Sequence, residues 1–85
     1  MRVNKVKYLR GYRLQVTFTN GSQKMMDLAG FLSQATNPMT IKYRDTNLFK
    51  QVAVAHGSLT WNGEMDIHAL DIYNDIFSLK RTAVN

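Results

Sequence analysis

Two histidines and a group of carboxylates near the end of the chain are the side chains that could do chemistry. His68 lies close in sequence to Glu64, Asp66 and Asp71, while His56 follows a short apolar run. A zinc site needs three or four His, Cys or carboxylate ligands that converge on one point. The group contains one histidine, and its carboxylates are typical of a helix cap and a solvated face. We therefore expect no metal and no cofactor.

No residue pattern is typical of an activated nucleophile or a phosphate-binding loop. The serines lie outside any G-x-S-x-G context, and the sequence has no G-x-x-x-x-G-K-[ST] run. The strings Asn20-Gly21-Ser22 and Asn62-Gly63-Glu64 are typical of turns. We expect that the protein is not an enzyme.

Positive charge is concentrated at the start of the chain. Residues 1–24 contain six basic residues and no acid, whereas residues 62–75 contain four acids and no Lys or Arg. Lysines often protect an exposed sheet edge from aggregation, which is one interpretation. The alternative is nucleic-acid binding, with phosphate contacts from five basic side chains and stacking by Tyr8 or Tyr12. The five are Lys5, Lys7, Arg10, Arg13 and Lys24.

Length and composition bound the architecture. The chain has 85 residues and 45% hydrophobic residues, enough for one core. We expect a single domain over residues 1–79 and a short C-terminal tail over 80–85. The sequence has no cysteine, which fits a reducing cytoplasm. No apolar run approaches the roughly 18 residues of a membrane helix, so we expect a cytoplasmic protein without a membrane segment.

The first third of the chain predicts a three-stranded unit. Residues 3–10 alternate weakly, and residues 13–19 alternate cleanly between apolar and polar side chains, as in a half-buried strand. Asn20-Gly21 predicts a type I′ turn with positive φ at both residues, after which residues 22–27 return antiparallel. The apolar side of the second strand consists of Leu14, Val16 and Phe18.

The middle of the chain predicts short elements. Asp27 is expected to cap a helical turn that ends near Gln34, and Asp45 to cap another over residues 46–51. Residues 35–44 include the sole proline and predict a connecting loop or a deformed edge segment.

A second hairpin is predicted after residue 51. Residues 52–55 are apolar, as in a central strand, and His56-Gly57 is a plausible two-residue loop. Leu59 and Trp61 then share one face of the next strand, which Asn62-Gly63 ends. Trp61 has two interpretations: a core anchor, or an aromatic at a groove rim that stacks on a ligand or base.

Residues 68–79 predict an amphipathic helix, with Asp66 as its N-cap and Ile72 and Phe77 in its apolar half. Together the elements predict an α+β fold. We expect a mostly antiparallel sheet of about four to five strands with the C-terminal helix packed on one face.

The ordered combination of these segments resembles a small bacterial domain of unknown function, which occurs alone or fused ahead of helix-turn-helix domains. The resemblance extends from residue 3 to about residue 76. It rests on short segments shared in order: Val3 and Val6, Tyr12 to Gly21, Asp27-Leu28, Phe49 to Val52, Gly57, Trp61 to Gly63, Asp66-Ile67 and Tyr73. Where the family usually carries a proline and then an acid, this chain has Ala69 and Leu70.

The resemblance implies a compact α+β domain whose gene often lies beside that of another small domain, in arrangements like toxin–antitoxin pairs. It implies a protein-binding, antitoxin-like role and supplies no catalytic residues. We therefore expect a non-enzymatic interaction domain, with Trp61 and Asp66 as candidate contact residues. Its partner would be the neighbouring gene product or a second copy of the chain. Nucleic-acid binding through the basic N-terminal strands is the alternative.

Overall fold

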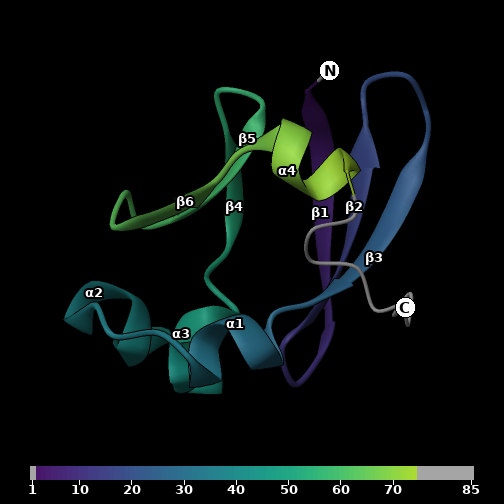
Figure 1. Cartoon of the computed structure of the whole chain (residues 1–85). Coiled ribbons are helices and arrows are strands. Elements are labelled where there is room, and N and C mark those ends of the chain that lie inside the picture. The colour runs from purple at the N-terminus through teal and green to yellow at the C-terminus, as the bar shows by residue number, and fades with distance from the viewer. Residues whose placement is uncertain (1, 75–85) are drawn as a thin grey trace.

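The computed structural model describes residues 2–74 and has an α+β architecture (Figure 1). Instead of the single sheet expected from the sequence, it contains two three-stranded antiparallel sheets. The first consists of β1 (Val3–Arg10), β2 (Arg13–Phe18) and β3 (Gln23–Asp27), and the second of β4 (Ala53–Ala55), β5 (Ser58–Trp61) and β6 (Met65–Ile67). The helices are α1 (Ala29–Ser33), α2 (Pro38–Ile41), the 3₁₀ turn η1 (Lys42–Arg44), α3 (Thr46–Phe49) and α4 (Ala69–Tyr73).

The first sheet follows the predicted alternation. Strand β2 lies between β1 and β3, and its register sets Leu14 opposite Met26 and Val16 opposite Lys24. Leu14, Val16 and Phe18 are fully buried, as their spacing predicted. The sheet therefore has one face in the core and one face in solvent.

The turn between β2 and β3 is not the predicted type I′ turn. Gly21 has a φ of +89°, but Asn20 is not among the residues with positive φ. The Gly21 N–H donates to Phe18 O over 2.9 Å and the Phe18 N–H to Ser22 O over 2.8 Å, which defines a three-residue loop. Asn20 Oδ1 accepts from the Ser22 N–H over 3.0 Å, and this bond holds the longer loop.

Short helices join the two sheets. The predicted cap at Asp45 is confirmed, because its carboxylate accepts from Asn47 N over 2.9 Å. The predicted cap at Asp27 is wrong: Leu28 is the N-cap of α1, and the Asp27 carboxylate instead accepts from Ala29 N over 2.9 Å in the turn that precedes the helix. The predicted loop over residues 35–44 instead contains α2 and η1. Asn37 caps α2 by accepting from Met39 N over 2.9 Å. Proline at the first helical position needs no N–H partner there, so Pro38 begins this helix rather than interrupting one.

The end of the described chain differs from the prediction. Asp66 is not a helix cap but the middle residue of β6, and helix α4 starts after His68, whose side chain makes no capping hydrogen bond. Met65 and Ile67 are buried on either side of Asp66, so the strand period of two prevails over the capping signal. Residues 75–79 of the predicted helix lie outside the described residues.

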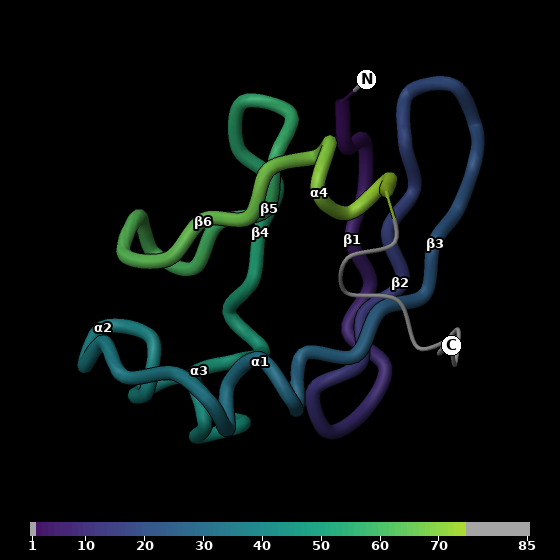
Figure 2. Tube along the Cα trace, in the orientation of Figure 1, coloured from purple at the N-terminus to yellow at the C-terminus, as the bar shows by residue number. Residues whose placement is uncertain are grey.

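Helix α4 lies over the first sheet, where the Tyr73 ring meets that of Phe18 edge-to-face at 5.3 Å. Figure 2 shows the path of the chain: from the first sheet through α1, α2 and α3 to the second sheet, then back across the first. The two sheets also meet directly, because the Val3 N–H donates to Gly57 O over 2.7 Å. Within residues 2–74, no helix has the length and apolarity to cross a membrane.

Candidate functional site in the second sheet

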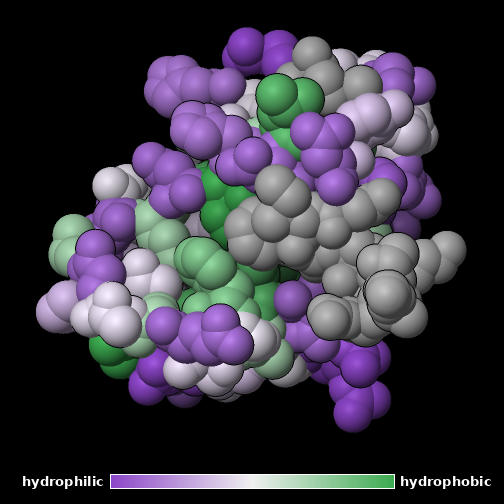
Figure 3. Space-filling view, viewed as in Figure 1, coloured by the Kyte–Doolittle hydropathy of each residue, from purple (hydrophilic) through white to green (hydrophobic). Residues whose placement is uncertain are grey.

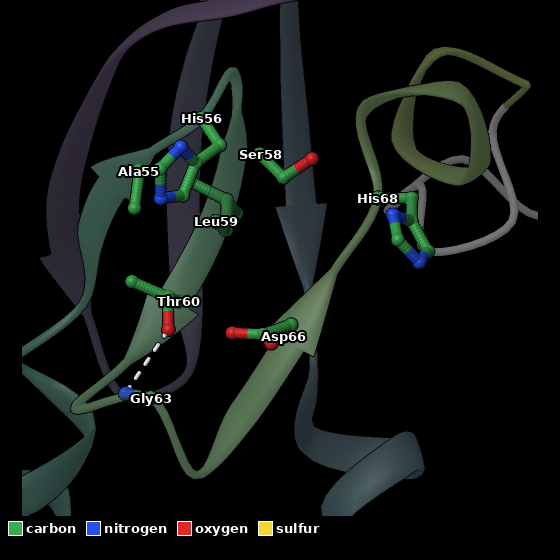
Figure 4. A pocket seen from close by; sticks show the side chains of 8 residues that line it. All are labelled: Ala55, His56, Ser58, Leu59, Thr60, Gly63, Asp66 and His68. Atoms are coloured by element: carbon green, nitrogen blue, oxygen red, sulfur yellow. Dashed lines mark hydrogen bonds between the residues drawn. The ribbon is translucent and has the colours of Figure 1, made fainter.

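A hollow of about 500 Å³ lies on the second sheet (Figure 4). The register places Ala53, Thr60 and Asp66 side by side, whereas Leu59 and Ile67 are paired at core positions. Because side chains alternate between the faces of a strand, the polar residues of β5 and β6 point out of the core. The polar residues that line the hollow are His56, Ser58, Thr60, Asp66 and His68.

Three local features position these side chains. His56 and Gly57 have φ values of +54° and +76°, which confirms the predicted two-residue hairpin loop between β4 and β5 and places His56 at one end of the hollow. Asp66 faces outward because its neighbours in β6 are buried. His68 occupies the junction between β6 and α4. A rigid sheet and two turns therefore hold the site.

The groups in the hollow leave most of their hydrogen-bonding capacity unused. Thr60 Oγ1 accepts from the Gly63 N–H over 3.2 Å. Within residues 2–74, the side chains of His56, Ser58, Asp66 and His68 make no hydrogen bond or ion pair. The hollow thus presents a carboxylate without a cation, a free hydroxyl and two imidazoles to whatever enters it.

Among residues 2–74, the side chains of His56, Ser58, Asp66 and His68 are not hydrogen-bonded to one another. Ser58 has no hydrogen bond to either histidine within the described part of the chain, so no base contacts its hydroxyl. No group of three or more His, Asp or Glu side chains among residues 2–74 is placed to hold a metal ion. The hollow therefore combines one carboxylate with hydroxyl and imidazole groups that can form hydrogen bonds.

A polar network anchors the turn between β5 and β6. The Lys42 Nζ donates to Glu64 Oε1 over 2.8 Å, and the Tyr43 hydroxyl lies 2.6 Å from the same oxygen. The amide nitrogen of Asn62 donates to the Tyr43 hydroxyl over 3.2 Å and to Gln51 Oε1 over 2.8 Å. The turn that ends the hollow is therefore tied to η1 and to Gln51, which follows α3.

This network shifts three pKa values. The hydrogen bonds from Lys42 and Tyr43 lower the pKa of Glu64, because they stabilise the carboxylate. The bond to Glu64 raises the pKa of Lys42. Burial, followed by the bond to Glu64, raises the pKa of Tyr43, because both disfavour the phenolate. All three shifts preserve the native protonation states near neutral pH.

The two residues predicted to contact a partner lie in different environments. Asp66 is exposed in the hollow. Trp61 is fully buried, and its Nε1–H donates to Phe49 O over 2.9 Å, which matches the core-anchor interpretation. Sequence reasoning did not find the hollow itself. The alternation of Ser58 and Thr60 with apolar neighbours indicated which face of β5 is polar. It did not indicate that β6 pairs with β5 and completes the hollow.

The five predicted phosphate-contact residues do not all share one face. Lys5 and Lys7 pair with Thr17 and Gln15, and Arg10 pairs with Arg13, so these four basic residues lie on the solvent face of the first sheet. Lys24 pairs with Val16 on the opposite face, where its Nζ lies 5.6 Å from the centre of the Tyr73 ring.

Tyr8 and Tyr12, the predicted stacking residues, lie on the core side of the first sheet. Their rings contact Phe49 edge-to-face, at 6.2 Å and 5.3 Å respectively. The Tyr12 hydroxyl donates to Arg44 O. Both tyrosines therefore contact α3 or η1 and do not project from the solvent face of the first sheet.

Comparison with known proteins identified one family. The family model described as "Protein of unknown function (DUF2442)" matches residues 3–78. Neither the curated proteins nor the solved structures provided a match to the chain.

Proposed function

The chain belongs to the DUF2442 family, and from the geometry of the second sheet we propose that it is a non-enzymatic domain that binds a protein partner in the hollow. The observation that carries this proposal is the exposed carboxylate of Asp66, which no cation within residues 2–74 neutralises. A Lys or Arg side chain of the partner would form a charge-assisted hydrogen bond with it.

The surroundings of Asp66 support a peptide rather than a small reactive substrate. The hydroxyls of Ser58 and Thr60 and the imidazoles of His56 and His68 are hydrogen-bonding groups that suit the main chain of a bound segment. They are spread along the hollow and are not gathered around one point. Asp66 is the acid that lines the hollow, whereas Glu64 in the adjoining turn is paired with Lys42 over 2.8 Å. A basic segment is the complementary partner.

The resemblance to small bacterial domains with toxin–antitoxin-like gene arrangements supplies the identity of the partner in this proposal. The partner is the product of the neighbouring gene, and the complex forms in the cytoplasm. The role is antitoxin-like, in which binding masks a surface of the partner and no bond is made or broken. Self-association through the same hollow is the competing mode.

Co-expression with the neighbouring gene product followed by pull-down tests this function. The wild-type chain should retain the partner, and Asp66→Lys should lose most of it, because the substitution replaces the unpaired carboxylate with a cation. Lys7→Glu, on the solvent face of the first sheet, is the matched charge-reversal control and should retain the partner.

Two results would count against the proposal. If the wild-type chain retains no partner, the antitoxin-like role loses its support. If Asp66→Lys and Lys7→Glu bind equally well, the hollow is not the contact surface. Light scattering of the isolated chain reports on the competing mode, since a dimer that Asp66→Lys abolishes would assign the hollow to self-association.

A further inference from the structure

We infer that the solvent face of the first sheet binds the phosphate backbone of nucleic acids without reading their sequence. Four basic side chains converge on this face, although they come from two strands: Lys5, Lys7, Arg10 and Arg13. Lys5, Lys7 and Arg10 make no ion pair within residues 2–74. They form an unneutralised cationic surface, which we call the basic face.

The composition of the basic face favours a polyanion. Within the described residues 2–74, the acid on this face is Asp27. It pairs with Arg13 over 3.5 Å and leaves the Arg13 side chain about half exposed. The other outward positions of β2 and β3 carry neutral groups, among them Gln15 and Gln23, whose side chains are hydrogen-bonded to each other over 3.1 Å. The amide groups are additional donors for phosphate oxygens. Within residues 2–74, no carboxylate lies between Lys5 and Lys7, where it would repel a phosphate.

The spacing of the cations suits a nucleic-acid strand. Lys5 and Lys7 are two residues apart on one strand, which separates them by about 6.8 Å along the strand axis. Two nucleotides of one DNA strand rise by about the same distance. Arg13 lies on the adjacent strand, opposite Arg10, and neighbouring strands of a sheet are about 4.8 Å apart. The four cations therefore form a short band of two rows. Such a band follows a backbone and does not form a pocket for a single phosphate.

Among residues 2–74, no aromatic side chain lies on the basic face for stacking. Tyr8 and Tyr12, expected to stack on bases, instead pack against Phe49 on the other side of the sheet. Stacking and base-edge contacts are what confer preference among bases. Besides its cations and amides, the face presents the Thr17 hydroxyl and the exposed Met25 side chain. Its charged contacts are to phosphates, so single-stranded and duplex DNA of any sequence should bind.

This inference is independent of the proposed function. The basic face lies on the first sheet and the hollow on the second, and their charges are opposite. One chain could therefore hold a basic protein segment and a nucleic acid at the same time. Charge reversal on the basic face does not alter the hollow, and charge reversal in the hollow does not alter the basic face. The two binding hypotheses can therefore be tested separately.

Fluorescence anisotropy with labelled single-stranded and duplex DNA tests the inference. Four phosphate contacts predict that affinity falls about a hundredfold between 50 and 200 mM salt. Lys7→Gln should reduce the slope of log affinity against log salt by about one. Lys7→Glu should weaken binding at least tenfold, whereas Asp66→Lys should not weaken it. Circular dichroism of each variant checks that the fold is intact.

Lys50→Glu is the matched control, because Lys50 is exposed on the far side of the sheet, beside the Tyr8 ring. It makes the same change in net charge and should leave affinity within about twofold of wild type. Equal losses in Lys7→Glu and Lys50→Glu would show attraction by net charge alone and overturn the inference. Absence of binding at low salt would also overturn it, as would equally strong binding of polyglutamate, which would point to an acidic protein segment instead.

Discussion

The indole N–H of Trp61 donates to the main-chain carbonyl of Phe49 over 2.9 Å, and the two rings lie 5.6 Å apart. This pair joins strand β5 of the second sheet to helix α3 inside the core, since both side chains are fully buried. The hollow on the other face of the sheet therefore rests on a fixed support.

Trp61→Phe should lower the free energy of unfolding by about 1–3 kcal/mol, because it removes the indole hydrogen bond and leaves the Phe49 carbonyl only the Val52 N–H, 3.3 Å away. Urea denaturation followed by circular dichroism measures the change. Thr60→Val, at the neighbouring half-buried position, is the control and should cost less. A Trp61→Phe protein as stable as wild type would show that this hydrogen bond contributes nothing to the fold.

Glu64→Gln should make the free energy of unfolding depend less on pH in the acid range. The pKa of Glu64 lies below its ordinary value of 4.5, so the carboxylate contributes stability above pH 4.5 that is lost as the pH falls through its native pKa. The glutamine variant cannot titrate and lacks that part of the slope. Urea melts of both proteins between pH 3 and pH 7 measure the difference. Parallel profiles would contradict the role of Lys42 and Tyr43 in holding the charged form.

Gly57→Ala should destabilise the protein more than Gly21→Ala. Both glycines have positive φ, +76° and +89°, so both substitutions strain the backbone by about 1–2 kcal/mol. At Gly57, however, the added methyl would lie 2.7 to 2.9 Å from atoms of the Arg2 side chain, whereas nothing lies within 4 Å of it at Gly21. Thermal melts compare the two variants. Equal losses would show that Arg2 moves aside without cost.

Ile72→Ala should cost about 2–5 kcal/mol, because the side chain is buried where α4 meets the first sheet. Leu70→Ala is its control in the same helix and should change stability by less than about 0.5 kcal/mol, since Leu70 is 61% exposed. Urea denaturation measures both. Similar values for the two variants would contradict the orientation of α4.

Local signals in the sequence predicted the parts of the fold that depend on neighbouring residues. The capping carboxylate of Asp45, the loop at His56-Gly57 and the alternation of β2 are all confirmed. Each depends on the hydrogen bonds or φ angles of a few adjacent residues, which residue type largely determines.

The errors arose where two local signals competed. Asn20-Gly21 favours a two-residue turn, but the Asn20 side chain bonds to Ser22 N and a three-residue loop forms. Asp66 suits a helix cap, but pairing with Thr60 keeps it in a strand. Asn37 followed by Pro38 was a helix-start signal that the irregular composition around it obscured.

The candidate site was beyond prediction from the sequence, because it depends on how strands pair at a distance. His56 and His68 line one hollow only because β6 folds back on β5. The division of the basic residues between two faces likewise needed the register of β1 and β3 against β2. Asp66 was identified as a contact residue, although its location on a strand was not foreseen.

The hydrogen bond from Val3 N to Gly57 O has a consequence for folding kinetics. Each sheet pairs only strands that are adjacent in sequence, so its hairpins can close within microseconds. Joining residue 3 to residue 57 instead closes a loop of more than half the chain, at a larger entropic cost. We therefore expect the docking of the two sheets, which this bond completes, to be slower than the closure of their hairpins.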